Sequence, residues 1–134
     1  MEPSKLIVVC DDEPSIRYVI ATKLKSCGYD VLVGTDGEEG LALCRENKPR
    51  LLITDFQMPS MSGLELCQAL AGDASTAEIP ILMLTARGHV ISDEDLAKAG
   101  IRETIAKPFG VRQLVERVAE WMGAEGSQAT VRAA

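Results

Sequence analysis

The sequence has few of the residues on which many metal and catalytic sites depend. It contains one histidine, His89, so a cluster of histidine ligands and a two-histidine catalytic mechanism are both excluded. Its four cysteines, Cys10, Cys27, Cys44 and Cys67, show no CxxC spacing and fall within apolar patterns. We therefore expect small buried side chains in a reducing compartment rather than a set of disulfides.

Long apolar runs and an excess of basic charge are also missing. The longest apolar runs, LIVV (6–9) and ILML (81–84), fall far short of the roughly 20 residues of a membrane span. We expect no signal peptide before them. The 14 basic residues against 20 acidic ones give a net charge of −6, and phosphate contacts need a basic face. The sequence predicts a cytoplasmic protein with no membrane insertion and no direct nucleic-acid binding.

Short apolar segments alternate with amphipathic ones along most of the chain. We expect strands at 6–10, 31–34, 51–54, 81–84 and 103–106, and helices at 14–27, 35–47, 63–71, 92–99 and 110–122. Nearly continuous apolar strands that alternate with helices are typical of a parallel sheet covered on both faces. The pattern predicts one α/β domain over 1–123, a doubly wound sheet of five parallel strands with five helices, and a disordered tail at 124–134.

Polar side chains follow four of the predicted strands. In a doubly wound sheet the ligand lies beyond the carboxyl ends of the strands. The residues at those ends are Asp11, Asp12 and Glu13 after the first strand, Asp55 after the third, Thr85 after the fourth and Lys107 after the fifth. We therefore expect these side chains to gather at one edge of the sheet.

Neighbouring carboxylates repel one another, and a divalent cation relieves that repulsion. Oxygen ligands without nearby histidine or cysteine favour a hard ion, so Mg²⁺ is the expected metal. A plainer interpretation is that Asp11 and Glu13 only cap the helix that Pro14 begins.

Beside a bound Mg²⁺, the carboxylate of Asp55 can attack phosphorus and form an acyl phosphate. Lys107 can then pair with one phosphoryl oxygen, and the Thr85 hydroxyl can donate a hydrogen bond to another. Taken singly, Asp55 could be a turn residue, Thr85 a helix cap and Lys107 a surface lysine. The joint pattern favours phosphoryl transfer, because each residue occupies the strand end that the fold predicts.

The motifs VVCDDEP, LLITDFQMPSMSG, PILMLTA and IAKPF stand in a familiar order and spacing. From about Lys5 to Met122 the chain resembles the receiver domain of two-component response regulators, a family that includes the single-domain chemotaxis regulator. The resemblance implies a flavodoxin-like three-layer sandwich with strand order 2-1-3-4-5.

The resemblance also implies roles for single residues. Asp55 would be the phosphoacceptor, and Asp12, Asp55 and the backbone carbonyl of Gln57 would bind Mg²⁺ directly. Asp11 would reach the ion through water. Thr85 would be the switch hydroxyl and Lys107 the lysine that binds the phosphoryl group, with a cis peptide bond before Pro108.

Two further positions bear on how such a domain would signal. The family often has Tyr or Phe three residues before the lysine, but this chain has Thr104. This chain therefore lacks the aromatic residue that would couple to Thr85, which leaves two alternatives: its output is read in another way, or it acts mainly as a phosphoryl carrier. Gln57 and Arg87 occupy the positions that tune loss of the phosphoryl group in the family.

The resemblance implies a phosphorylatable module whose donor is a phosphohistidine on a separate histidine kinase or histidine phosphotransfer protein. Donor contacts are expected near Ile16 and at Pro108 and Phe109, and a downstream protein would read the face of the fourth helix, fifth strand and fifth helix. Such a module is not an enzyme beyond its own phosphorylation and dephosphorylation.

Four other interpretations of the sequence are a phospho-independent scaffold, a receiver fragment of a larger regulator or hybrid kinase, a flavodoxin-like cofactor binder and an Asp-dependent phosphatase. An acidic loop at 11–13 would repel the phosphate of a flavin cofactor, and a phosphatase would leave Asp55 and the KPF segment unexplained. We expect a stand-alone receiver.

Overall fold

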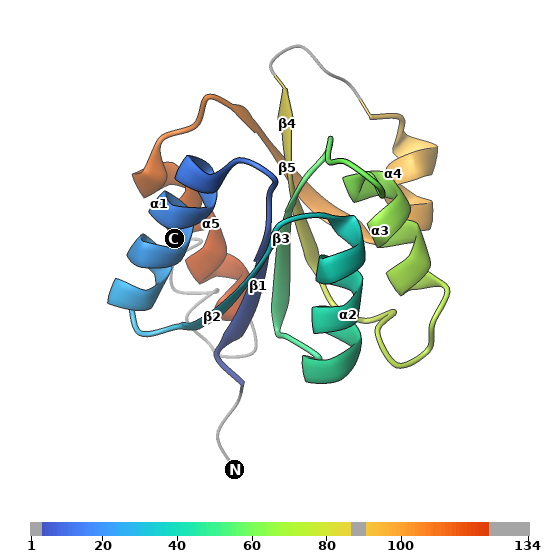
Figure 1. The fold of residues 1–134 in the computed structure, drawn as a ribbon, viewed down its shortest axis with the longest axis horizontal. Coiled ribbons are helices and arrows are strands. Elements are labelled where there is room, and N and C mark those ends of the chain that lie inside the picture. The colour runs from blue at the N-terminus through green and yellow to red at the C-terminus, as the bar shows by residue number, and fades with distance from the viewer. Residues whose placement is uncertain (1–3, 87–90, 124–134) are drawn as a thin grey trace, which may run out of the picture.

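The computed structural model describes residues 4–86 and 91–123, which form one parallel sheet between two layers of helices (Figure 1). The strands are β1 (Leu6–Cys10), β2 (Asp30–Gly34), β3 (Leu51–Asp55), β4 (Ile81–Ala86) and β5 (Ile101–Lys107). The helices are α1 (Pro14–Ser26), α2 (Gly37–Asn47), α3 (Gly63–Ala71), α4 (Asp93–Ala99) and α5 (Val111–Met122). The strand order β2-β1-β3-β4-β5 confirms the predicted doubly wound fold.

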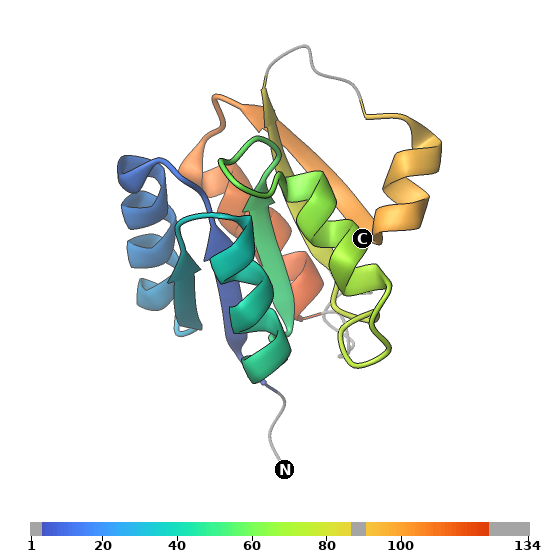
Figure 2. The ribbon, with the colours of Figure 1, turned by 45° about the vertical axis from the view of Figure 1, so that its right-hand side comes forward.

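The helices divide between the two faces of the sheet, as Figures 1 and 2 show. Helices α1 and α5 cover one face, where strand side chains pack with Ile20, Leu24 and Leu114 in what we call the α1/α5 cluster. Helices α2, α3 and α4 cover the other face, where Cys44, Leu66 and Ala99 belong to the α2/α3/α4 cluster. Because both faces are buried, the central strands need apolar residues at nearly every position.

Strand β5 is longer than the sequence predicts. It runs over Ile101–Lys107 rather than 103–106, and its residues alternate between buried and exposed. It lies at the edge of the sheet, where only part of each residue is covered. A half-buried edge strand has no continuous apolar run, so the apolar pattern identified only its middle.

The prediction of buried cysteines was wrong for one residue. Cys10, Cys44 and Cys67 are buried, but Cys27 is exposed at the C-terminal end of α1, where Gly28 takes a positive φ of 98° and ends the helix. All four are free thiols. The predicted tail, His89 and Arg87 lie outside the described residues.

Within the described ranges, no helix has both the length and the apolar character that a membrane crossing requires.

Candidate functional site

Strand periodicity explains why three charged side chains meet at the carboxyl edge of the sheet. Side chains alternate between faces along a strand, so residues two apart share a face. Each of the three lies two residues beyond a member of the α1/α5 cluster: Asp11 after Val9, Asp55 after Ile53 and Lys107 after Ile105. The sheet therefore brings two acids and a lysine together from β1, β3 and β5.

Lys107 links the two buried acids. Its Nζ lies 3.2 Å from Asp11 Oδ2 and 3.2 Å from Asp55 Oδ1. Asp11 is fully buried, Asp55 is 8% exposed, and the more exposed Asp12 completes the group. One carboxylate oxygen from each of the three acids lies within 4.8 Å of the others. Three carboxylates around one ammonium group leave the cluster with a net negative charge.

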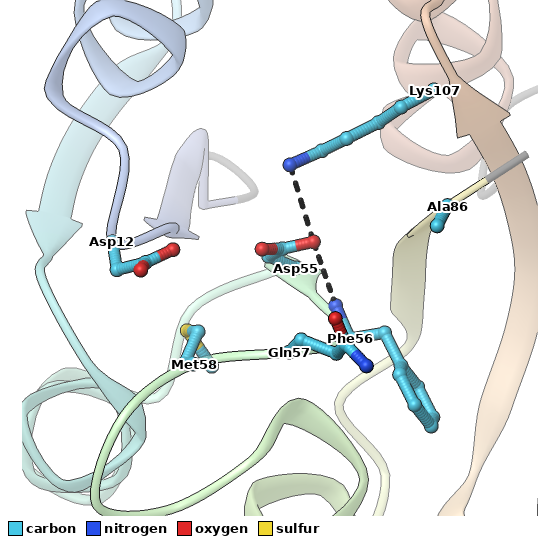
Figure 3. A pocket seen from close by; sticks show the side chains of 7 residues that line it. All are labelled: Asp12, Asp55, Phe56, Gln57, Met58, Ala86 and Lys107. Carbon is cyan, nitrogen blue, oxygen red and sulfur yellow. Dashed lines mark hydrogen bonds and ion pairs between the residues drawn. The ribbon is translucent and has the colours of Figure 1, made fainter.

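The acids open onto a cavity lined by Asp12, Asp55, Phe56, Gln57, Met58, Ala86 and Lys107 (Figure 3). Asp55 Oδ1 accepts a hydrogen bond from the backbone N–H of Phe56 at 3.0 Å and faces Lys107. The other carboxylate oxygen of Asp55 points toward Asp12 in Figure 3. Gln57 thus lines the same cavity as Asp12 and Asp55, the acids with which the resemblance grouped it.

Burial and charge shift the protonation of both partners. Burial and the neighbouring charge of Asp11 raise the pKa of Asp55, although Lys107 and the Phe56 N–H act in the opposite direction. Burial lowers the pKa of Lys107, but the charges of Asp11 and Asp55 outweigh it, and the net shift is upward. Burial and the charge of Asp11 therefore disfavour the ionised form of Asp55, and a further cation would stabilise it.

The turn after β1 is held by two hydrogen bonds. Asp11 Oδ1 accepts from the backbone N–H of Glu13 at 2.9 Å, and Arg17 Nη1 donates to the carbonyl of Asp11 at 2.8 Å. Glu13 occupies the N-cap position of α1 but makes no side-chain cap, and Pro14 follows it. The turn thus accounts for one oxygen of Asp11, while the other oxygen faces Lys107, and neither Asp11 nor Glu13 caps α1 with its side chain.

The family model of the response regulator receiver domain matches residues 7–119. The chain belongs to the response regulator receiver domain family. Asp11, Asp55 and Lys107 all lie within the matched range.

Curated relatives include two transcriptional regulators. The chain is 37% identical over 112 residues to the DNA-binding dual master transcriptional regulator RpaA of Synechocystis, covering 84% of this chain and 46% of that protein. It is 38% identical over 114 residues to the phosphate regulon regulatory protein PhoB of Pseudomonas aeruginosa, covering 85% and 50%. The receiver domain thus spans about half the length of these relatives.

Solved structures agree with the fold. The chemotaxis response regulator CheY4 of Vibrio cholerae is 28% identical with a TM-score of 0.81, over 89% of this chain and 99% of that chain. The receiver domain of the sensor histidine kinase PA1611 of Pseudomonas aeruginosa is 25% identical with a TM-score of 0.79, over 90% and 99%. That second structure holds a magnesium ion in its active site cleft.

Two predicted positions of the receiver domain lie on the opposite face of the sheet. Thr85 follows Met83 of the α2/α3/α4 cluster by two residues and is 4% exposed, and its neighbour Ala86 lines the cavity. Thr104, where the family often has an aromatic residue, is exposed on β5 opposite Met83. The Lys107–Pro108 peptide is cis, as the resemblance implies.

Sequence reasoning missed two contacts of this site. Arg17 donates to the backbone carbonyl of Asp11, six residues earlier and before the start of α1, so the spacing of neighbours on a helix does not indicate this contact. The thiol of Cys10, whose pKa burial raises to about 12, lies 3.6 Å from Met58 Sδ. No sequence pattern pairs residues from separate strands and loops in this way.

Proposed function

We propose that this receiver domain accepts a phosphoryl group on Asp55 from a phosphohistidine, in a Mg²⁺-dependent reaction. The observation that carries the proposal is the position of Asp55, a largely buried carboxylate that faces both a lysine and two further acids at the mouth of a cavity. A structural carboxylate needs a counter-ion but gains nothing from two acidic neighbours.

The residues fit a magnesium ion. The three carboxylates offer oxygen ligands only, and burial together with the charge of Asp11 raises the pKa of Asp55, so its ionised form would gain from a nearby cation. Asp12, Asp55 and the carbonyl of Gln57 would hold the ion directly, and Asp11 would hold one of its waters. A bound Mg²⁺ supplies positive charge that offsets the negative charge of the transferred group.

The transfer forms a bond between a carboxylate oxygen of Asp55 and phosphorus and breaks the N–P bond of the donor histidine, which then takes up a proton. The N–H of Phe56 holds Asp55 Oδ1 and so fixes the orientation of the carboxylate. Lys107 would move its hydrogen bonds from the acids to the phosphoryl oxygens. The Thr85 hydroxyl would donate to another of these oxygens and report the new state.

Two surfaces are proposed for partners. Donor docking is assigned to an apolar depression lined by Ser15, Ile16, Val19, Ile20 and Phe109, between α1 and the segment before α5. A downstream protein would read the face of α4, β5 and α5, either through a change of conformation or by taking the phosphoryl group. In this proposal the domain works in the cytoplasm and catalyses no reaction beyond its own phosphorylation and dephosphorylation.

Incubation with acetyl phosphate and Mg²⁺ tests the proposal. We expect a mass increase of one phosphoryl group, which should not form when EDTA is present from the start and should be absent from Asp55→Asn. Asp73→Asn is the matched control, because Asp73 lies on the loop after α3, away from the cavity lining, and should leave labelling unchanged. Labelling that persists in Asp55→Asn would sink the assignment.

A further inference from the structure

Cys10 is the last residue of β1, and its thiol makes two contacts across the fold. Cys10 Sγ donates a hydrogen bond to the carbonyl of Asp36, the N-cap residue of α2, at 2.9 Å. The same sulfur lies 3.6 Å from Met58 Sδ in the segment between β3 and α3. Cys10 is fully buried, whereas its two partners, Asp36 and Met58, are half-buried.

The surroundings of this sulfur leave it little room to move. A Cβ atom added at Gly40 would lie 2.8 Å from Cys10 Sγ, and one added at Gly34 would lie 3.5 Å from it. At the start of α2, a Cβ at Gly37 would collide with the backbone of Met61. The start of α2 therefore packs tightly against both Cys10 and the segment that follows β3, so a displacement at one contact is transmitted to the others.

These contacts tie together the two segments that carry the predicted metal oxygens. Asp11 directly follows Cys10, and Gln57 directly precedes Met58. Met58 also lines the cavity with Asp12 and Asp55. By strand alternation Cys10 points to the face opposite Asp11, so its sulfur does not itself face the acids.

We propose that Cys10 is a positioning residue for the magnesium site, and this inference rests on the proposed function. Its thiol bridges β1, the N-terminus of α2 and the segment after β3, and so sets the distance between the carboxylates of Asp11 and Asp12 and the carbonyl of Gln57. Supporting residues of this kind orient the groups that touch a metal and change its affinity without touching it.

The test compares Cys10→Ala with Cys44→Ala. Both cysteines are fully buried in the α2/α3/α4 cluster, and both changes delete one sulfur atom. Each variant should lose thermal stability, because the deleted sulfur atom leaves an empty space in the core. Titration calorimetry should show the Kd for Mg²⁺ raised about tenfold in Cys10→Ala. Cys44→Ala should stay within about twofold of the wild type, because the loss of packing alone does not move the ligands.

Cys10→Ser keeps a donor for the Asp36 carbonyl and serves if the alanine variant fails to fold. If both variants fold, the Kd of Cys10→Ser for Mg²⁺ should lie between those of the wild type and Cys10→Ala. If only Cys10→Ser folds, its Kd should stay within about threefold of the wild type. In acetyl phosphate assays, saturating Mg²⁺ should restore most of the labelling rate of either Cys10 variant, since the defect lies in metal binding.

Equal Kd values for Cys10→Ala and Cys44→Ala, with the wild type binding Mg²⁺, would overturn this inference and leave the proposed function intact. If Cys10→Ser alone is folded, a Kd more than about tenfold above the wild type would overturn the bridging role of the thiol donor. A wild-type protein that binds no Mg²⁺ would overturn the proposed function, and this inference with it.

Discussion

Asp55→Asn should stabilise this receiver domain in metal-free buffer at neutral pH. With an effective dielectric constant of about 20, Lys107 attracts Asp55 Oδ1 at 3.2 Å by roughly 5 kcal/mol. At up to 4.8 Å, Asp11 repels the same carboxylate by roughly 3.5 kcal/mol or more, and exposed Asp12 adds about 1 kcal/mol after solvent screening. These attractive and repulsive terms nearly cancel, so the cost of burying the charge of Asp55 decides whether Asp55→Asn raises or lowers the free energy of unfolding.

Asparagine keeps an oxygen that can accept from the N–H of Phe56 and from Lys107, but it carries no charge. We therefore expect the free energy of unfolding to rise by about 1 kcal/mol, which for a domain of this size raises Tm by about 3–5 °C. Differential scanning calorimetry at pH 7 with EDTA measures the difference. Adding Mg²⁺ should narrow it, because the ion stabilises the wild type more than the variant.

The pH dependence of the stability difference between Asp55→Asn and the wild type distinguishes an effect of charge from an effect of packing. The pKa of Asp55 is higher in the folded than in the unfolded state, so its ionisation destabilises the fold, and the penalty disappears as pH falls through the folded pKa. The advantage of Asp55→Asn should therefore be present at pH 7 and vanish in acid. Asp73→Asn should act in the opposite direction, because hydrogen bonds from Ser75 lower the pKa of Asp73. An unchanged Tm at pH 7, or a gain that persists in acid, would refute the reasoning.

Three further outcomes are expected. Lys107→Met should lower the free energy of unfolding by about 2 kcal/mol at pH 7 in urea titrations, since two acids lose their cation, and the difference should shrink as pH rises through the raised pKa of Lys107. Asp12→Asn should raise Tm without metal, by less than Asp55→Asn, because Asp12 is exposed; a lower Tm would make Asp12 structural. Glu103→Gln should cost about 1–2 kcal/mol in urea unfolding followed by Trp121 fluorescence, because it weakens the paired hydrogen bonds from Arg117 and the bond from the Trp121 indole. Burial raises the pKa of Glu103, but these hydrogen bonds lower it overall. The stability that they contribute should therefore be lost as pH falls through the folded pKa of Glu103. An unchanged urea midpoint of Glu103→Gln at pH 7 would contradict this role.

Much of the fold follows from local patterns. The ends of helix α1 were predicted because Pro14 favours a first helical turn and Gly28 adopts the positive φ that ends a helix. The central strands were predicted because burial on both faces demands continuous apolar residues. Strand β5 was predicted only in part, because its residues face solvent and core in turn, and only long-range pairing with β4 defines its bounds.

The candidate site was predicted less completely. The sequence placed Asp11, Asp12, Asp55 and Lys107 at strand ends, and the structure brings them together. The sequence assigned Lys107 to a phosphoryl group and did not predict that this lysine already bridges Asp11 and Asp55. The roles of Gln57 and Thr85 stay predictions.

By itself, the sequence determined the class of fold and the chemistry available at its edge, because strand periodicity and the order of motifs are local properties of the chain. The tertiary structure alone decided how close those charges come, how deeply each is buried and which atoms contact them. Lys107 is 96 residues from Asp11 along the chain, yet their charged groups lie 3.2 Å apart. Likewise, 48 residues separate Cys10 from Met58, and their sulfur atoms touch. Such contacts depend on sheet order and on the close packing of loops against strands, which no local pattern encodes.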